Sequence, residues 1–252
     1  MSKRVSVGFV SAVIGVAFLV GCEGAKMQSK PCGCGGAPAA SKPAAAPAKP
    51  ASAPAKSVAA AKPQAGKWAL VFTDDFNGPK LGPSWEAVQG QATLDKGMLV
   101  LKAESEGQAV LLLRQPSFPD NVRMEFDASI SGTGLSDMTA IVNASSSEPA
   151  DTGYMFQFGG SGNTENHLRR DGDVIASTAK NSPLLTANKV YHVVAENDAG
   201  KLTLYVDDKP VFQYTDPKPL KGAQRAFVGL YTWDSTLKID RVMIYTKEPA
   251  AK

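Results

Sequence analysis

Cysteine and histidine are scarce in this chain, which has three Cys and two His among 252 residues. All the cysteines lie before residue 35, so the rest of the chain must be held together by a hydrophobic core and not by disulfide bonds. His167 and His192 are too far apart in the sequence for the spacing of a zinc-ligand pair. No Gly-x-Ser-x-Gly elbow and no phosphate-binding glycine loop occur, which excludes the enzyme classes that these motifs define.

The chain also lacks an apolar run of the roughly 20 residues that a transmembrane helix needs. Its longest run, residues 5–20, follows a short basic start and therefore predicts a signal peptide over residues 1–21. The run ends in LVGC, which resembles a bacterial lipobox. That resemblance implies cleavage before Cys22, lipidation of Cys22 and an exported lipoprotein anchored to a membrane, on the periplasmic side or at the cell surface. A plain secretory signal with a chance cysteine is the alternative.

Large apolar side chains are nearly absent from residues 22–66, where Ala-Pro-Lys units recur, as in SKPAAAPAKPASAPAKS. Seven of the chain's 17 prolines fall in this segment, which favours extended polyproline geometry over a folded core. We therefore expect a disordered tether that holds a domain away from the membrane. Cys32 and Cys34 in the tether could bind a soft metal or form a strained disulfide, but no Cys or His close by completes a coordination shell.

Excess positive charge is confined to the first part of the chain. Residues 23–66 carry six Lys and one Glu, whereas residues 67–252 carry 19 basic and 23 acidic side chains, a net charge of −4. A mildly acidic domain argues against nucleic acid as a partner, because phosphate backbones bind to basic surfaces. The basic tether could lie along an anionic envelope polymer or lipid surface, or be a solvated spacer.

No convincing helical pattern occurs after residue 66, where short segments alternate apolar and polar residues between turn signals. In VRMEFDASI, residues 122–130, alternate side chains from Val122 to Ile130 are apolar and fall on one face. The segment 191–216 predicts three antiparallel strands joined by turns at DAG and DD, and Asp171-Gly172 marks another hairpin.

The last strand contains a change of phase. Leu237 and Ile239 are out of phase with Val242 and Ile244, which predicts a β-bulge near Asp240-Arg241. Taken together, residues 67–247 predict an all-β domain of about a dozen antiparallel strands, followed by a short tail of residues 248–252.

Three segments carry a family resemblance: VFTDDFNG (71–78), VYHVVAENDAGKLTLYVDDKPV (190–211) and AFVGLYTWDSTLKIDRVMIY (226–245). In this order they resemble the concanavalin A-like jelly rolls of the lectin/glucanase and laminin-G kind, including bacterial 3-keto-disaccharide hydrolase-like domains. The resemblance implies an antiparallel jelly-roll β-sandwich. It does not define the function, because this fold carries lectins, hydrolases and adhesion modules.

Glycoside hydrolysis normally requires two carboxylates on either side of the scissile bond. Glu125 and Asp127 share one strand face, as in the Glu-x-Asp-x-x-Glu pattern of the glucanases, but Ile130 stands where the third acid should be. The alternative is an ordinary polar outer face with Arg123 beside two carboxylates. If the domain is an enzyme, Glu125, Asp127 and His167 are the acid/base candidates.

The stretch GYMFQFGGSGNTENHLRRDG, residues 153–172, is the candidate ligand surface. Sugar-binding sites combine an aromatic platform with planar amide or guanidinium donors for hydroxyl groups. If the glycine-rich loop brings the two strands together, one patch would contain aromatic, amide, imidazole, guanidinium and carboxylate groups from Tyr154, Gln157, His167, Arg169, Trp233 and Asp234. The alternative is a solvated pair of strands whose glycines only permit a wide turn.

Two further sites follow from the residues. His192 alternates with Val190 and Val194, so we expect its ring to pack inward with a hydrogen-bond partner. Asp75 and Asn77 in DDFNG offer hard oxygen ligands for a structural calcium ion, with Asp240 at the late position that many such sandwiches use. A simple Asp/Asn/Gly turn is the alternative.

The sequence therefore predicts an envelope-anchored lipoprotein whose β-sandwich binds carbohydrate or a cell-envelope glycan. One alternative is a glycosidase-like enzyme acting on 3-keto-disaccharides. The other is a structural or protein-interaction module without a small ligand.

Overall fold

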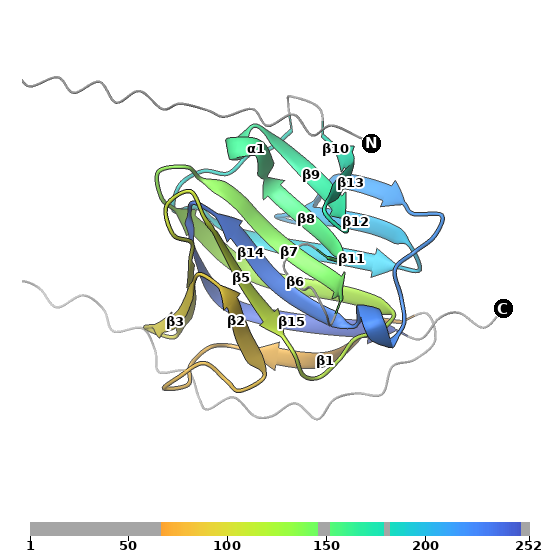
Figure 1. Ribbon diagram of the computed structural model, residues 1–252, viewed down its shortest axis with the longest axis horizontal. Coiled ribbons are helices and arrows are strands. Elements are labelled where there is room, and N and C mark those ends of the chain that lie inside the picture. The colour runs from red at the N-terminus through yellow and green to blue at the C-terminus, as the bar shows by residue number, and fades with distance from the viewer. Residues whose placement is uncertain (1–66, 146–151, 179–181, 248–252) are drawn as a thin grey trace, which may run out of the picture. The chain divides into compact units, whose positions relative to one another are not determined.

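The computed structural model describes residues 67–145, 152–178 and 182–247, which form two antiparallel β-sheets packed face to face (Figure 1). The predictions for the signal peptide, Cys22, the tether with Cys32 and Cys34, and the tail lie outside these ranges. Within them, no helix is long and apolar enough to cross a membrane. The all-β antiparallel sandwich is confirmed, with fifteen strands in the described ranges in place of about a dozen.

One sheet has eight strands. The order along it is β13 (Lys209–Thr215), β12 (Lys201–Val206), β11 (Val190–Asp198), β6 (Asn121–Ser131), β15 (Thr236–Lys247), β4 (Met98–Lys102) and β3 (Gln91–Asp95), with β1 (Ala69–Asp74) paired to β15.

The other sheet has seven strands. The order is β10 (Asp173–Ser177), β9 (Glu165–Arg170), β8 (Tyr154–Gly159), β7 (Ser136–Ala144), β14 (Phe227–Trp233), β5 (Gln108–Leu113) and β2 (Trp85–Gln89). Two short helical segments, α1 (Gly160–Asn163) and η1 (Ala223–Arg225), complete the described elements. α1 joins β8 to β9 at the upper end of the seven-stranded sheet in Figure 1.

The core lies between the sheets and is built by period-two alternation. On β6, the apolar side chains from Val122 to Ile130 are all buried in it, as the pattern predicted. The hairpins β11–β12–β13 and β9–β10 form where the turn signals placed them. The register of β15 against β6 shifts between Ile239 and Arg241, which confirms the predicted bulge.

The outer face of the seven-stranded sheet, which points away from the other sheet, carries a second and smaller hydrophobic cluster. Its buried members come from β5, β7, β8 and β14: Val110, Leu112, Ile141, Ala144, Met155 and Tyr231. Polar side chains flank this apolar centre at both ends of the strands: Arg114 pairs with Glu86 at one end, and Gln157, His167 and Arg169 gather at the other. The candidate site lies at that end.

His192 does not pack into the core, so this prediction is wrong. Tyr191, Val193 and Ala195 are the buried core residues of β11, and Val190 is 65% exposed. The alternation therefore has the opposite phase to the one expected. The expected hydrogen-bond partner exists on the outer face, where His192 Nδ1 lies 2.8 Å from Asp127 Oδ1.

Candidate functional site

The α1 segment between β8 and β9 is a left-handed turn. Gly159, Ser161, Gly162 and Asn163 have φ angles from 51° to 80°, a region that glycine reaches without steric cost and asparagine tolerates. The Asn163 side chain anchors the turn, because its amide donates to the Leu185 carbonyl and its oxygen accepts from the Leu185 N–H, both at 2.9 Å. The turn is thereby held in one conformation.

Gly160 in this turn lets two side chains come close to the backbone. A Cβ atom at this position would lie 2.8 Å from His167 Cδ2 and 3.5 Å from Asp137 Oδ1. The imidazole of β9 and the carboxylate of β7 therefore lie against the same Cα atom. A side chain at residue 160 would occupy the space beside the His167 ring and the Asp137 carboxylate and would push them apart.

An open pocket of about 400 Å³ lies beside the turn, within the size range of small-ligand sites. Strands β7, β8, β9, β10 and β14 and the α1 turn contribute its lining, which consists of Ser136, Asp137, Gln157, Ser161, Gly162, His167, Arg169, Val174, Tyr231 and Trp233. Four residues of the predicted ligand set meet here: Gln157, His167, Arg169 and Trp233. That they bind a ligand stays a prediction.

Asp137 is the most unusual residue of the pocket. It has a left-handed backbone with φ 65°, which is uncommon for a residue with a side chain, and only 6% of it is exposed. Its Oδ1 atom is buried without a hydrogen-bond partner in the described ranges. Burial raises the pKa of this carboxyl group to about 6, although a hydrogen bond with the Ser136 side chain and the charge of Arg169 both act to lower it.

The other polar groups of the pocket are only partly engaged. His167 Nε2 lies 3.2 Å from Ser161 Oγ and 3.8 Å from Glu165 Oε2. Arg169 Nε donates to the Gly172 carbonyl at 2.9 Å, which fixes the side chain beside the β9–β10 turn. Gln157, paired with His167 across β8 and β9, is nearly buried, and its side-chain amide makes no hydrogen bond within the described residues. These groups can therefore donate to or accept from a ligand.

Apolar surface completes the pocket. Trp233 is 41% exposed and Val174 is 48% exposed, and both line it. Only one other large hydrophobic side chain is exposed in the described part of the chain, which is Val190 on the eight-stranded sheet. Exposed apolar surface next to polar groups that converge on one cavity is typical of a binding site.

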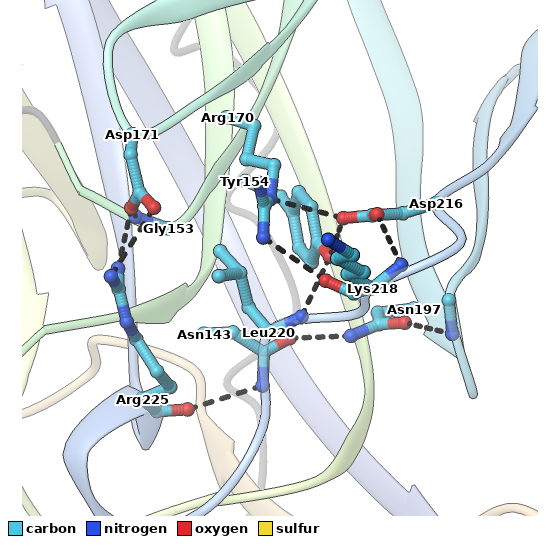
Figure 2. A network of polar contacts seen from close by, with 11 residues as sticks. Asn143, Gly153, Tyr154, Arg170, Asp171, Asn197, Asp216, Lys218, Leu220 and Arg225 are labelled. Atoms are coloured by element: carbon cyan, nitrogen blue, oxygen red, sulfur yellow. Dashed lines mark hydrogen bonds and ion pairs between the residues drawn. The ribbon is translucent and has the colours of Figure 1, made fainter.

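The structure contradicts the prediction that Tyr154 faces the ligand. Its side chain is fully buried in the core, on the face of β8 opposite Gln157. Its hydroxyl donates to Asp216 at 2.6 Å and accepts from the Leu220 N–H at 2.8 Å, while Arg170 pairs with the same carboxylate (Figure 2). Tyr154 therefore holds the segment after β13 against the sandwich.

Asp234 does not line the pocket either. Its Oδ1 atom accepts the Glu106 N–H at 3.1 Å, and its own N–H donates to the Gly107 carbonyl at 2.9 Å. The carboxylate is thus used to attach the loop before β5 to the end of β14. Asp234 has a structural contact in place of the predicted ligand contact.

Glu125 and Asp127 do not join His167. They project from the outer face of the eight-stranded sheet, whereas His167 lies on the outer face of the other sheet. Glu125 pairs with Arg123, and Asp127 contacts His192 and Arg241. The three acid/base candidates therefore do not converge on one site, and Glu125 lies beside Arg123 on a polar outer face, as the alternative expected.

Two residues of the predicted calcium site, Asp75 and Asn77, form a local turn. Asp75 Oδ1 accepts the Asn77 N–H at 3.3 Å, as in an Asx turn, and Asp240 is exposed on β15. No group of three or more His, Cys, Asp or Glu side chains that could hold a metal occurs in the described part of the chain. Calcium binding through Asp75, Asn77 and Asp240 stays a prediction.

Asp137 was missed by sequence reasoning. It directly follows a glycine- and serine-rich segment and resembles a turn residue. The signal that could have revealed it is the alternation of Met138, Ala140 and Val142 in the core, which places Asp137 on the outer face of β7. Its closeness to His167 depends on the pairing of β7 with β8 and of β8 with β9, which no local pattern encodes.

A comparison with protein families gives one match. The family model of the 3-keto-alpha-glucoside-1,2-lyase-like domain covers residues 71–245, which include nearly all of both sheets and every pocket residue. The chain belongs to this family. The match agrees with the 3-keto-disaccharide hydrolase-like resemblance of the sequence. A comparison with curated proteins found no match.

Solved structures share the fold. A carbohydrate-binding module, CBM66 from Bacillus subtilis, is 23% identical and superposes with a TM-score of 0.53 over 65% of this chain and 96% of that one. A Bacillus subtilis protein of unknown function with a galectin-like fold is 13% identical, with a TM-score of 0.58 over 74% and 99% of the two chains. The apo Crh5 transglycosylase is 16% identical, with a TM-score of 0.54 over 76% and 90%.

Proposed function

We propose that the protein binds carbohydrate in the pocket between β7, β8, β9, β14 and the α1 turn. The observation that carries this proposal is the convergence of an exposed indole, Trp233, with the amide of Gln157 and the guanidinium of Arg169 in one open pocket. An apolar sugar face can pack on Trp233 and Val174, while hydroxyl groups bond to the amide, guanidinium and carboxylate. The family and the carbohydrate-binding module among the structural neighbours support the same ligand class.

A glycan array with the full chain tests this proposal, followed by calorimetry on the glycans that bind. We expect Trp233→Ala and Arg169→Ala each to weaken binding at least on the order of tenfold, because each removes a direct contact. Lys238→Ala, on an exposed position of β15 outside the pocket, is the control and should bind like the wild type. If both pocket variants bind glycan like the wild type, the assignment of the site is refuted. If the folded wild-type protein binds no glycan on the array, the proposed function is refuted.

Asp137 supports a second candidate, an enzyme that acts on 3-keto-glucosides. In such a sugar the C2 hydrogen is acidic because it lies next to the C3 ketone. Asp137 is buried and its Oδ1 atom has no hydrogen-bond partner in the described residues, so it would take the C2 proton. The electrons of the C–H bond would form the C1–C2 double bond as the C1–O bond breaks. The leaving oxygen would then take up a proton. His167, whose ring lies with Asp137 beside Gly160, is the candidate to supply that proton.

The test is release of 4-nitrophenol from 4-nitrophenyl 3-keto-α-glucoside, corrected for the rate without protein. We expect turnover to rise with pH through about 6, as the Asp137 carboxyl group loses its proton, and Asp137→Asn to lower kcat by a factor on the order of 100 or more. If Asp137→Asn binds glycan and turns over at the wild-type rate, Asp137 is not the base. If the wild type binds glycan without turnover, the protein is a binding module.

We also propose that the domain is held on the outside of a membrane by lipid on Cys22, since the LVGC motif supports this modification. Cys22→Ser should abolish incorporation of labelled fatty acid and release the protein from the membrane fraction. A variant that keeps both properties would refute the anchor.

A further inference from the structure

A second pocket lies on the other side of Trp233. It measures about 410 Å³ and is lined by Gln89, Gly90, Glu104, Gly107, Gln108 and Trp233. The indole is therefore a shared wall between this pocket and the one that contains Asp137. None of the other residues of the second pocket lines the first.

The register of the sheet places both pockets on one line across the strands. Trp233 on β14 is the partner of Gln108 on β5 and of Ser136 on β7. Neighbouring strands are about 4.8 Å apart, so the two flanking residues lie about 10 Å from each other, one on each side of the indole. A chain of sugar rings laid across the strands would meet the Asp137 pocket, then Trp233, then the second pocket.

The second pocket is fixed by the same strand end that carries Trp233. The Asp234 N–H donates to the Gly107 carbonyl and the Glu106 N–H donates to Asp234 Oδ1, so the loop 104–107 is attached to the residue after the indole. On the other wall, Gly90 has φ 69° and a Cβ there would lie 2.5 Å from Ala109 Cβ, so β2 and β5 meet closely. The pocket is thus preformed, which lowers the entropic cost of binding.

The chemistry of the second pocket suits a neutral sugar. Two amide side chains, Gln89 and Gln108, can bond to hydroxyl groups in both directions. The only charged side chain in its lining is the carboxylate of Glu104. A carboxylate accepts hydrogen bonds from hydroxyl groups but repels an anionic sugar.

We infer that the two pockets are adjacent subsites for one uncharged oligosaccharide of at least two units, with Trp233 between them. The inference rests on the proposed carbohydrate binding and extends it to a ligand class. Single sugars would occupy the Asp137 pocket alone, and the second unit would be recognised by Gln89, Glu104 and Gln108.

Calorimetry with the full chain tests the inference. The probes are glucose, the α- and β-linked glucose oligomers of two to four units, and a glucuronic acid–glucose disaccharide. We expect at least one disaccharide to bind on the order of tenfold more tightly than glucose, and the acidic disaccharide to lose that gain. The Gln89→Ala/Gln108→Ala double variant should lose the same factor for the disaccharide and keep the wild-type affinity for glucose. Lys238→Ala is the control, and thermal melting verifies the fold of each variant.

The outcomes separate the two proposals. If glucose binds, Arg169→Ala abolishes this binding and chain length has no effect, carbohydrate binding holds and the second subsite is refuted. If longer oligomers bind more tightly but Gln89→Ala/Gln108→Ala leaves that gain intact, the second pocket is also refuted. If none of these sugars binds to a folded wild-type protein, the proposed function fails for glucose-based ligands and the subsite inference fails with it.

Discussion

Asp137 combines a strained backbone with a desolvated carboxyl group at the wall of an open pocket. Each property has a free-energy cost, and proteins retain such costs mainly at functional sites. Arg169 and Ser136 reduce the cost without removing it, because the net pKa shift is still upward. A ligand hydroxyl that donated to Oδ1 would satisfy the atom that has no partner in the described residues.

The raised pKa predicts how stability varies with pH. Because the folded-state pKa of about 6 is above the ordinary 3.8, the folded protein binds this proton more tightly, and stability decreases as pH rises from about 4 to 6. Asp137→Asn cannot ionise and tolerates the left-handed backbone. The variant should therefore not lose stability in this way. The difference in free energy of unfolding, variant minus wild type, should increase by on the order of 2 to 3 kcal/mol between pH 4 and pH 8.

Urea unfolding of both proteins at several pH values measures this difference. Asp127→Asn, a change of the same kind on a partly exposed carboxylate, is the matched control. A constant difference between Asp137→Asn and the wild type from pH 4 to pH 8 would show that the carboxyl group is not desolvated.

At the scale of elements, the left-handed α1 turn decides the shape of the site. It closes the upper end of β8 and β9 and brings Ser161 and Gly162 to the pocket wall. Gly159 is required by packing as well as by φ, because a Cβ there would lie 2.2 Å from Leu185 Cδ1. The glycine-rich loop therefore does more than permit a wide turn.

Gly160→Ala tests this role. Its Cβ would displace the His167 ring and narrow the space next to Asp137, so we expect binding of the array-identified glycan to weaken on the order of tenfold, with a stability loss of about 1 kcal/mol. Gly222→Ala, outside both pockets, is the control: its Cβ meets no atom within 4 Å, and it adds only the strain of a positive φ. Wild-type affinity in a folded Gly160→Ala variant would contradict the proposed site.

At the scale of the whole molecule, the two outer faces of the sandwich present different side chains. The seven-stranded sheet presents the two pockets, and the outer face of β6 and β11 presents paired charges around Asp127 and His192. Charge pairs of this partly exposed kind contribute little to stability.

Asp127→Asn should accordingly leave glycan binding and any turnover at wild-type levels. It loses its contacts with His192 and Arg241, which predicts a change of less than about 1 kcal/mol in the free energy of unfolding. The array, the nitrophenol assay and urea unfolding measure the three quantities. If a folded Asp127→Asn variant lost binding or turnover, the functional site would lie on the outer face of β6 and not at the pockets.

The sequence by itself determined the sandwich, because period-two alternation and turn residues act within a few residues of each other. The core face of β6, the hairpin at Asp171-Gly172 and the bulge in β15 followed from local pattern alone. On β11 both alternating sets of residues contain apolar side chains, so the pattern did not distinguish the faces. The prediction placed His192 toward the core, whereas Tyr191 and Val193 lie there.

Only the tertiary structure decided which polar residues form a site. Gln157, His167 and Arg169 share an outer face by strand period, but Trp233 joins them because β14 pairs with β7, more than 60 residues away in the sequence. Tyr154 was excluded, and Asp137 included, because the pairing of the sheets sets which side of each strand is buried. A sequence specifies the period of each strand locally, whereas convergence in space depends on contacts between strands that local patterns do not contain.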